Sequence, residues 1–583
     1  MNIFYSSIII LLLSCNTLLA QTQNVYKLKA DEAFASFKFK SAIALYHFSD
    51  TTDKEVIERT AEAYKAIKDY KNAERWYQKQ SLLISQPDHF LLNYAEILAN
   101  NGKYELSGIY YKKYRDKHPG DKRALNLSTV HENSNNFYKD SLNWKLEFLS
   151  INTPKDEFAP AYFKRGLIFA SNRNKRRGIR NIFGSNESPF TDLYFAEDTS
   201  KITHFSPQVY LNWANFPIAG AQKPRFAVSV NDSKVLRNDT YPKAVARSNK
   251  FKDTSGVHVL HGGLNTRFHD GPVSHAANQS YLLFNRNNRH SNSDGGQDIY
   301  KLSMLSLQYA GGTWYNLRPF EYNSVDYSVA HPAISQDGRL LYFVSDMPGG
   351  IGKKDIYYCT RESITNAWSK PVNLGPTFNT EGDETFPFLT ADNVLYFSSD
   401  GYAGLGGLDI FYVKIKNDLP SGAATNMGYP LNSSKDDFGI TLSPDNTSGY
   451  LSSDRYGSDD IFRFRHNKLT FKLEGKVFTD YAGGKRVLEN VLVKVRHNNI
   501  VDSVYTDNMG HFSLNLDPET NYDIEAEKEA YTIDSNTATT IGLIRSVTLE
   551  MELHLNRLEQ IKTTLKSREL ANNNSLYDKR LRK

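Results

Sequence analysis

The spacing of apolar residues changes along the chain and divides the sequence into a helical part and two strand-rich parts. Between residues 25 and 145, small and aromatic residues recur at the three- and four-residue intervals of a helix face. From residue 156 to 466, short runs of strand formers are separated by Gly, Asp, Asn and Ser. A second strand-rich region covers residues 469–555 and precedes a polar tail at 557–583. We therefore expect a multidomain chain with an all-α arm, a large all-β domain and a small β-sandwich.

The helical part contains a repeat. Residues 70–79 and 104–113 match in residue type at a distance of 34 residues, each with a small residue followed by two aromatics. An earlier copy at residues 39–46 lies 31 residues upstream of the first of these. A period of about 34 residues is that of the tetratricopeptide repeat, whose stacked helix pairs expose a concave groove. We predict tetratricopeptide-like repeats over residues 25–145, which either bind a partner in the groove or pack against the next domain.

The strand-rich run between residues 156 and 466 repeats one unit. An apolar strand ends in a polar pair such as Ser-Asp, a glycine-rich loop follows, and the next strand begins Asp-Ile-Tyr or a close variant. The unit is clear at residues 331–357, 386–411 and 438–462 and looser at 166–194 and 281–300. Strand units near 50 residues in length indicate a β-propeller, in which radial closure protects the sheet edges. We predict five or six blades, because the long gap between the first two copies accommodates a sixth blade or an insertion.

One aspartate recurs at the same place in every copy of this unit. A role repeated in each blade favours structure over catalysis, with each carboxylate accepting hydrogen bonds from turn amides. Calcium binding is the alternative, but the loops lack the dense Asp/Asn spacing of an EF-hand. The repeated positions are Asp192, Asp298, Asp355, Asp409 and Asp460.

The C-terminal strand-rich region predicts a small β-sandwich over residues 469–555. Its Thr506-Asp507-Xaa-Xaa-Gly510-Xaa-Phe512 segment resembles that of carboxypeptidase-regulatory-like domains, which have a transthyretin-type fold. This resemblance implies a structural or interaction module and no peptidase. Residues 557–583 are expected to form a polar C-terminal tail.

The propeller unit resembles the TolB-like, WD40-like repeats of bacterial envelope proteins. With the arm and the small β-domain, the chain is similar to PorE-like, OmpA-family proteins of type IX secretion and gliding systems. The segments that carry this likeness are 265–273, 328–333, 346–350, 379–388, 406–411 and 432–439. The resemblance implies a scaffold that binds envelope proteins, among them an outer-membrane barrel. The family's C-terminal OmpA-like domain, which grips peptidoglycan, has no counterpart here, so peptidoglycan is not expected as a partner by that route.

The first residues predict export to the periplasm or the outer membrane. An apolar stretch at residues 8–13 and the Ala20-Gln21 junction read as a signal peptide over residues 1–20. The alternative is a lipoprotein box at residues 12–15, in which Cys15 is acylated. The only other cysteine is Cys359, so a chain cut after Ala20 has no disulfide and no thiolate zinc site.

The net charge and the absence of certain motifs reduce the number of functions to be considered. A net charge of +5 without a basic stripe gives no reason to expect nucleic acid. Neither Gly-Xaa-Ser-Xaa-Gly nor His-Glu-Xaa-Xaa-His occurs. The cluster of His258, His261, His269 and His275 lacks a paired carboxylate and favours loop histidines over a metal site. We therefore predict a scaffold that is not an enzyme and needs no cofactor or metal; the alternative is a propeller that binds carbohydrate or peptidoglycan fragments on its aromatic-rich face.

Overall fold

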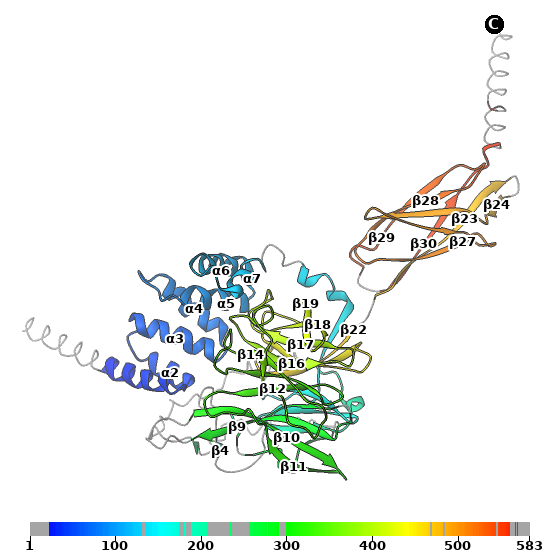
Figure 1. The fold of residues 1–583 in the computed structure, drawn as a ribbon. Coiled ribbons are helices and arrows are strands. Elements are labelled where there is room, and N and C mark those ends of the chain that lie inside the picture. Colours follow the sequence, from blue (N-terminus) through cyan, green and yellow to red (C-terminus); the bar gives the residue numbers. More distant parts are fainter. Residues whose placement is uncertain are drawn as a thin grey trace, which may run out of the picture. The chain divides into compact units, whose positions relative to one another are not determined.

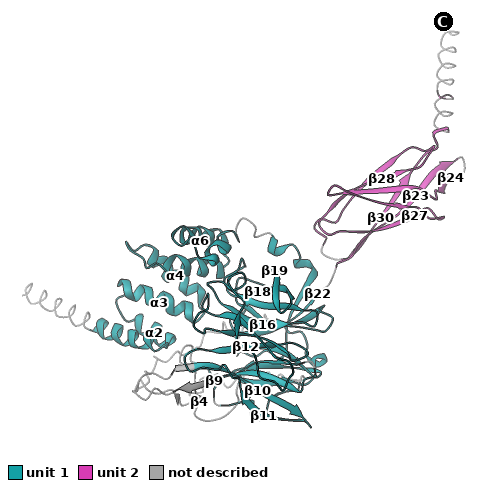
Figure 2. Cartoon of the chain, in the orientation of Figure 1, with its two compact units in different colours: residues 1–466 teal, residues 467–583 magenta. Residues whose placement is uncertain are grey.

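The computed structural model describes most of the chain in two compact units, Met1–His466 and Asn467–Lys583 (Figure 2). The predicted leader with Cys15, the repeated Asp298 and most of the 557–583 tail lie outside the described residues. The described residues are 22–130, 136–173, 180–181, 188–206, 234–235, 256–266, 268–276, 278–290, 299–466, 469–481, 484–543, 546–559, 566 and 568.

The N-terminal region is helical, as predicted (Figure 1). Residues 22–35 are helical and precede α2 (Phe39–Tyr46), α3 (Lys54–Ala66), α4 (Tyr70–Ser81), α5 (Phe90–Asn100), α6 (Tyr104–Lys117) and α7 (Lys122–Ser128). Asp53, Asp69 and Asp121 begin α3, α4 and α7 by accepting a backbone N–H with their carboxylates. Each helix packs on the next one along the chain, from α2 to α7. The buried residues of these contacts include the Ala73 and Tyr77 of the sequence repeat.

The remainder of the first unit is all-β. Among its described residues, five antiparallel four-stranded sheets form, and a two-stranded pair, β4 (Arg180–Asn181) with β6 (Lys234–Val235), lies apart. The sheets are β2 (Glu157–Phe163), β3 (Gly166–Ser171), β5 (Asp192–Ala196) and β7 (Val257–Val259); β8 (Asp270–His275), β9 (Tyr281–His290), β10 (Ile299–Ala310) and β11 (Thr313–Pro319); β12 (Val329–Ile334), β13 (Leu340–Ser345), β14 (Asp355–Thr360) and β15 (Val372–Asn373); β16 (Glu384–Leu389), β17 (Val394–Ser399), β18 (Asp409–Lys416) and β19 (Leu419–Asn426); and β20 (Asp437–Leu442), β21 (Ser448–Ser453) and β22 (Asp460–His466) with β1 (Trp144–Phe148).

The first strands of the five sheets surround a central channel. β2, β8, β12, β16 and β20 contact one another in a closed ring, and apolar clusters fill the spaces between neighbouring sheets. The ring closes through the first strand of this all-β part, because β1 pairs with β22 and completes the last sheet. Phe148 on β1 lies opposite Phe462 in this pairing. The structure therefore confirms a helical region that is followed by a large part built of four-stranded sheets.

Each of these first strands bulges at the same position. The register shifts by one residue, and a residue with positive φ occupies the bulge. Glycine favours this conformation, but only two of the five positions hold one. The bulge residues are Ala159 (φ 50°), Gly271 (φ 105°), His331 (φ 49°), Phe386 (φ 48°) and Gly439 (φ 60°).

The second unit contains two four-stranded sheets around one apolar core. One comprises β23 (Phe471–Tyr481), β24 (Gly484–Val487), β27 (His511–Leu516) and β30 (Val547–His554); the other comprises β25 (Leu492–His497), β26 (Ile500–Tyr505), β28 (Asn521–Glu527) and β29 (Asp534–Thr539). Burial alternates along β23, as the strand pattern of the sequence requires. Gly475 on this strand has no room for a side chain, since a Cβ would lie 2.3 Å from the Phe512 ring.

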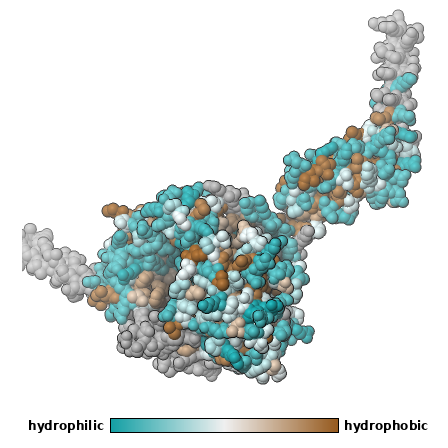
Figure 3. Space-filling model, in the orientation of Figure 1, coloured by the Kyte–Doolittle hydropathy of each residue, from teal (hydrophilic) through white to brown (hydrophobic). Residues whose placement is uncertain are grey.

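Figure 3 shows apolar residues exposed on the face of the second unit that is in view. Large apolar side chains exposed in this unit include Ile500, Val501, Tyr505 and Met509. In the part of the chain that the structure describes, no helix has the length and apolarity needed to cross a membrane.

Candidate functional site

The candidate site is the end of the channel where the first strands begin, and its framework is an asparagine repeated five times. Each asparagine accepts the backbone N–H of a residue on the third strand of the preceding sheet and donates to the same residue's carbonyl. Asn379, for example, bonds Ile356 in both directions at 3.0 Å. The pairs are Asn152 with Ile461, Asn265 with Leu193, Asn323 with Met304, Asn379 with Ile356 and Asn432 with Ile410. These bonds tie each sheet to its neighbour around the whole ring.

A buried carboxylate follows five residues after four of these asparagines. Each accepts the N–H and the hydroxyl of a Ser or Thr four residues earlier, and each carboxylate residue is fully buried. The four residues are Glu157, Asp270, Glu384 and Asp437, bonded to Thr153, Thr266, Thr380 and Ser433. Ser328 occupies the position in the third sheet. Burial raises the pKa of both Glu157 and Glu384 to about 7.

The aspartates predicted from the Asp-Ile repeat lie beside this framework. Asp355 accepts the amides of Ile351 and Gly352 at 2.6 and 3.0 Å, and Asp409 accepts that of Gly406 at 3.2 Å. Asp192 is buried at the start of β5. Burial, reinforced by the Glu157 carboxylate, raises the pKa of Asp460 to about 9, and burial also raises that of Asp409.

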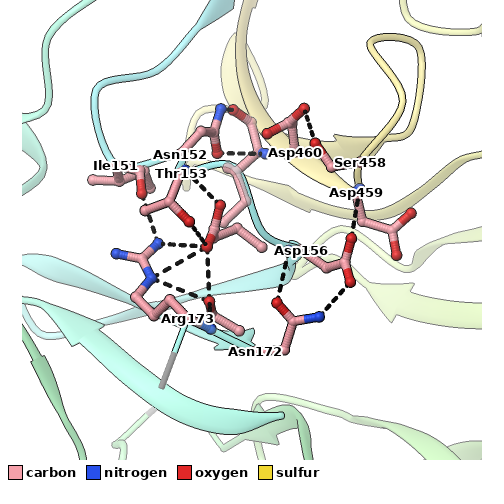
Figure 4. A network of polar contacts seen from close by, with 12 residues as sticks. Ile151, Asn152, Thr153, Asp156, Asn172, Arg173, Ser458, Asp459 and Asp460 are labelled. Atoms are coloured by element: carbon pink, nitrogen blue, oxygen red, sulfur yellow. Dashed lines mark hydrogen bonds and ion pairs between the residues drawn. The ribbon is translucent and has the colours of Figure 1, made fainter. Parts of the chain in front are cut away.

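Figure 4 shows the junction where the last sheet meets the first. Asn152 bonds Ile461 there, and the Glu157 carboxylate contacts Arg173 at 3.1 Å. Asp156 accepts the N–H of Asp459 at 3.4 Å across the same junction. The ring is therefore closed by polar bonds at this end as well as by strand pairing.

At this end of the channel, Lys68 of the helical arm reaches a group of carboxylates. Its Nζ lies 2.7 Å from Asp436, 3.4 Å from Asp454 and 3.5 Å from Asp459, three residues of the last sheet's loops. Burial opposes the charge on Lys68, but the three carboxylates outweigh it and raise the lysine's pKa above its ordinary value. Burial raises the pKa of Asp454 to about 7 and raises that of Asp459. Burial acts the same way on Asp436, yet the Lys68 ammonium holds its pKa below the ordinary value.

Further bonds hold the arm over the fourth and fifth sheets. The Lys435 ammonium donates to the carbonyl of Asn100 at 2.7 Å and lies 4.6 Å from the centre of the Tyr70 ring. The Glu381 carboxylate accepts the N–H groups of Lys122 and Arg123 at 3.0 and 3.3 Å. Asn126 donates to the carbonyl of Gly401, and Tyr429 donates its N–H to that of Phe137. The predicted alternative in which the arm packs on the next domain is thus the observed arrangement.

The lining of the other end of the channel is largely uncharged, and Lys164 is the one Lys, Arg, Asp or Glu residue in it. A cavity of about 380 Å³ is lined by the first strands of all five sheets and includes Pro160, Pro272, Pro332 and Pro387. In its lining, the ring of His331 stacks on that of Phe386 at 3.9 Å, and the Phe386 ring lies 4.7 Å from that of Phe438. Burial, aided by Lys354, lowers the pKa of His331 to about 3, so this imidazole is uncharged.

The predicted histidine cluster does not come together as a metal site. His269 lies against Thr191 with a pKa lowered to about 4 by burial, while His275 contacts the carbonyl of Tyr162. His258 lies 3.6 Å from Glu197. Cys359 is buried in β14, and burial raises the pKa of its thiol to about 12. Its chemistry is that of a small apolar residue.

Sequence reasoning missed another group, in the helical arm. The Nε2 atom of His89 lies 2.8 Å from a carboxylate oxygen of Glu62 and 3.6 Å from one of Glu58. Across the residues that the structure describes, this is the one set of His, Cys, Asp and Glu side chains with ligand atoms close enough to share a metal ion. The two glutamates are one helical turn apart, but His89 comes from a different element. The spacing of residues along the sequence therefore does not predict this group.

No protein-family model matches the sequence, and no curated protein matches it significantly. Among solved structures, a TolB protein from Agrobacterium tumefaciens is 14% identical with a TM-score of 0.22, covering 50% of this chain and 89% of that one. Prolyl endopeptidases (9% identity, TM-score 0.24) cover 71% of this chain, and a Mycobacterium tuberculosis puromycin-hydrolysing peptidase (10%, 0.26) covers 70%. This chain spans 43% and 54% of those two, about half of their length. The set thus includes a β-propeller of the TolB type.

The prediction that the chain is not an enzyme is contradicted by these comparisons. Prolyl endopeptidases, the puromycin-hydrolysing peptidase and an oligogalacturonate lyase from Vibrio parahaemolyticus are enzymes with similar structures. The prediction failed because it rested on two local motifs, whereas catalytic groups also meet from distant segments. At TM-scores of 0.21 to 0.26, the likeness assigns no activity to this chain.

Proposed function

We propose that this protein is a cell-envelope scaffold that binds other envelope proteins. In this proposal the helical region is a tetratricopeptide arm, the five sheets are the blades of a TolB-like propeller, and the second unit is a carboxypeptidase-regulatory-like module. The chain then works as PorE-like, OmpA-family proteins of secretion and gliding systems do, with an outer-membrane barrel as one partner. Export, and with it a place in the periplasm or at the outer membrane, belongs to the same proposal.

The observation that supports this proposal is the way the arm sits on the propeller. Charged and polar bonds from α5, α7 and the turn at Lys68 fasten one side of the arm to the loops of two sheets. Its remaining surface exposes apolar side chains, with Leu82 83% and Ile84 106% exposed in the loop that follows α4. A rigidly held surface with exposed apolar residues favours stable binding of a protein partner, because little conformational entropy is lost on binding.

The test is affinity capture with chemical crosslinking from envelope fractions, using the full chain. We expect an outer-membrane barrel to crosslink to the wild type and to be lost from the double variant Leu82→Asp with Ile84→Asp. Leu419→Asp, at a leucine that is 45% exposed on β19, is the matched control and should retain the barrel. Equal capture by all three chains would remove the arm from the proposal, and absence of any envelope protein would overturn it.

A second candidate function, binding of carbohydrate or peptidoglycan fragments, is favoured by the cavity at the other end of the channel. Its volume of about 380 Å³ lies within the usual range for small-ligand sites, and its lining combines aliphatic and proline residues with aromatic rings, amides and hydroxyl groups. Titration of the full chain with soluble muropeptides and neutral oligosaccharides tests it. Saturable binding of one of these ligands, together with the absence of a crosslinked protein partner, would favour this function over that of a scaffold.

The mode of envelope attachment needs a separate measurement. Mass spectrometry of the mature N-terminus distinguishes cleavage after Ala20 from acylation of Cys15. A free Gln21 terminus makes the protein periplasmic or held by partners, whereas a lipid on Cys15 makes it membrane-anchored. An uncleaved Met1 terminus in envelope fractions would contradict the export prediction.

A further inference from the structure

A histidine and two glutamates of the helical arm lie together at the junction of two helix pairs. Glu58 and Glu62 are one turn apart on α3, so their side chains lie on the same face of that helix. His89 directly precedes α5, and its carbonyl accepts the N–H of Asn93, four residues further on. The backbones of two helices therefore set the positions of all three side chains.

The separations of the three ligand atoms match those around one small metal ion. His89 Nε2 lies 2.8 Å from a carboxylate oxygen of Glu62 and 3.6 Å from one of Glu58, and all three atoms lie within 4.8 Å of one another. Zinc binds imidazole nitrogen and carboxylate oxygen at about 2.0 to 2.2 Å, so two of its ligand atoms are about 3 to 3.6 Å apart. Small rotations of the side chains therefore bring all three atoms onto one ion.

The two glutamates repel each other, because like charges one helical turn apart are unfavourable. Among the described residues, neither forms an ion pair with a lysine or an arginine, and His89 is the one ion-pair partner of both. One turn further along the same two helices, the Lys65 ammonium of α3 donates to Asn93 at 2.6 Å and pairs with Glu96, both on α5. These helices are thus joined through a cation at one level, and at the next level they present ligands for another.

A buried hydroxyl lies beside these carboxylates. Tyr77 of α4 is fully buried, and no group of the described residues meets its hydroxyl in hydrogen-bond geometry, although the Asn93 amide is near. Burial, and after it the Glu62 carboxylate, raises the pKa of Tyr77 well above its ordinary value, so the hydroxyl is close to Glu62. Buried hydroxyls are ordinarily hydrogen-bonded, and a water held by a metal ion at Glu62 would be a suitable partner.

The donor set selects a transition-metal ion. One imidazole nitrogen with two carboxylate oxygens suits zinc and its neighbours in the first transition row, whereas calcium and magnesium prefer oxygen ligands alone. Three protein ligands leave zinc an open position for water or a further ligand. The three side chains are between 24% and 48% exposed, so an ion reaches them from solvent.

We infer that Glu58, Glu62 and His89 form a binding site for one divalent transition-metal ion, for which zinc is the best match. The ion joins α3 to the start of α5 and so fastens two successive helix pairs of the arm. It also holds one end of the loop that exposes Leu82 and Ile84, because His89 is the last residue of that loop. The site does not depend on the scaffold function, since its three ligands all belong to the arm.

Zinc titration of the full chain, first freed of metal with a chelator, tests this site. We expect the wild type to bind one zinc ion per chain and its first unit to gain several degrees in thermal midpoint, whereas magnesium at the same concentration should have neither effect. His89→Ala, Glu58→Gln and Glu62→Gln should each weaken zinc binding by about tenfold or more and lose the gain in stability. Cobalt(II) should bind in place of zinc and give visible absorption bands that His89→Ala abolishes.

Two variants separate this site from other groups that bind zinc. Glu105→Gln, at an exposed glutamate of α6, and His261→Ala, at an exposed histidine of the predicted cluster, should bind zinc as tightly as the wild type. If His89→Ala does not fold, the two glutamine variants carry the test, because they keep the size and shape of the glutamates.

Three results would overturn the inference: zinc binding that survives His89→Ala or both glutamine variants, binding that is lost equally in His261→Ala, and stabilisation that magnesium matches. Absence of zinc binding by the wild type would also overturn it, without affecting the capture test of the scaffold function.

Discussion

The two ends of the channel are built from the same five strands but differ in chemistry. Where the strands begin, asparagines, buried carboxylates and Lys68 form a charged network under the arm. Where they end, prolines and the stacked rings of His331 and Phe386 line a cavity in which Lys164 is the one Lys, Arg, Asp or Glu residue. The difference shows that five strands of one repeated design can carry a charged network at one end and a largely uncharged cavity at the other.

The largest effect is expected from the repeated asparagine. Asn379→Ala leaves both the N–H and the carbonyl of Ile356 without their side-chain partner in a buried place. We expect a loss of about 2 to 4 kcal/mol in the free energy of unfolding. Urea unfolding measures it, with exposed Asn366→Ala as a control that should change by less than about 0.5 kcal/mol. Similar values for the two variants would show that the asparagines do not hold the sheets.

The second effect concerns the charged end alone and depends on pH. Burial raises the folded pKa of Asp460 to about 9, while its unfolded value is near 4. Protonated Asp460 therefore makes its whole contribution to the free energy of unfolding below about pH 4. That contribution is lost as the pH rises toward 9, because the unfolded chain gives up the proton first. Asp460→Asn should raise the free energy of unfolding by about 1 to 3 kcal/mol at pH 8 and leave it unchanged at pH 4. A variant that is equally stabilised or destabilised at both pH values would contradict a neutral Asp460.

A third prediction concerns the end of the channel that holds the cavity. Phe386→Ala removes one ring from the stack with His331 and Phe438 but keeps the strained backbone. We expect a loss of about 2 kcal/mol in the free energy of unfolding, measured by heat or urea, without the pH dependence expected for Asp460→Asn. A strong change in that loss between pH 5 and 8 would show that the two ends of the channel are energetically coupled.

The smallest effect is expected from a second lysine at the charged end. Lys354 contacts Asp383 at 3.0 Å, but its side chain is 46% exposed, and this partner belongs to the sheets and not to the arm. We expect Lys354→Met to change the free energy of unfolding by less than about 1 kcal/mol, and addition of salt should reduce the effect further. A loss above about 2 kcal/mol would show that this pair acts as a buried ion pair and not as an exposed one.

Much of the fold could be predicted because its signals are local. Helix periodicity and the 34-residue repeat mark the arm, and the Asp-Ile unit marks the third strand of four described sheets. The asparagine five or six residues before each first strand is equally visible as a repeat, at Asn265 and Asn379 among others, but the sequence does not show what its side chain bonds. Nothing local shows that this side chain bonds a strand about 20 to 70 residues earlier, or, for Asn152, 309 residues later.

The sequence by itself determined the kinds of element, their order and the repeated framework, because hydrophobic period and turn residues act over a few positions. Only the tertiary structure decided that the arm covers one end of the channel, that Lys68 meets three aspartates, and that β1 completes the last sheet. These contacts join residues more than 300 positions apart, and their energy depends on burial and charge that exist only once the ring has closed. The same ring closure gives the channel its two different ends.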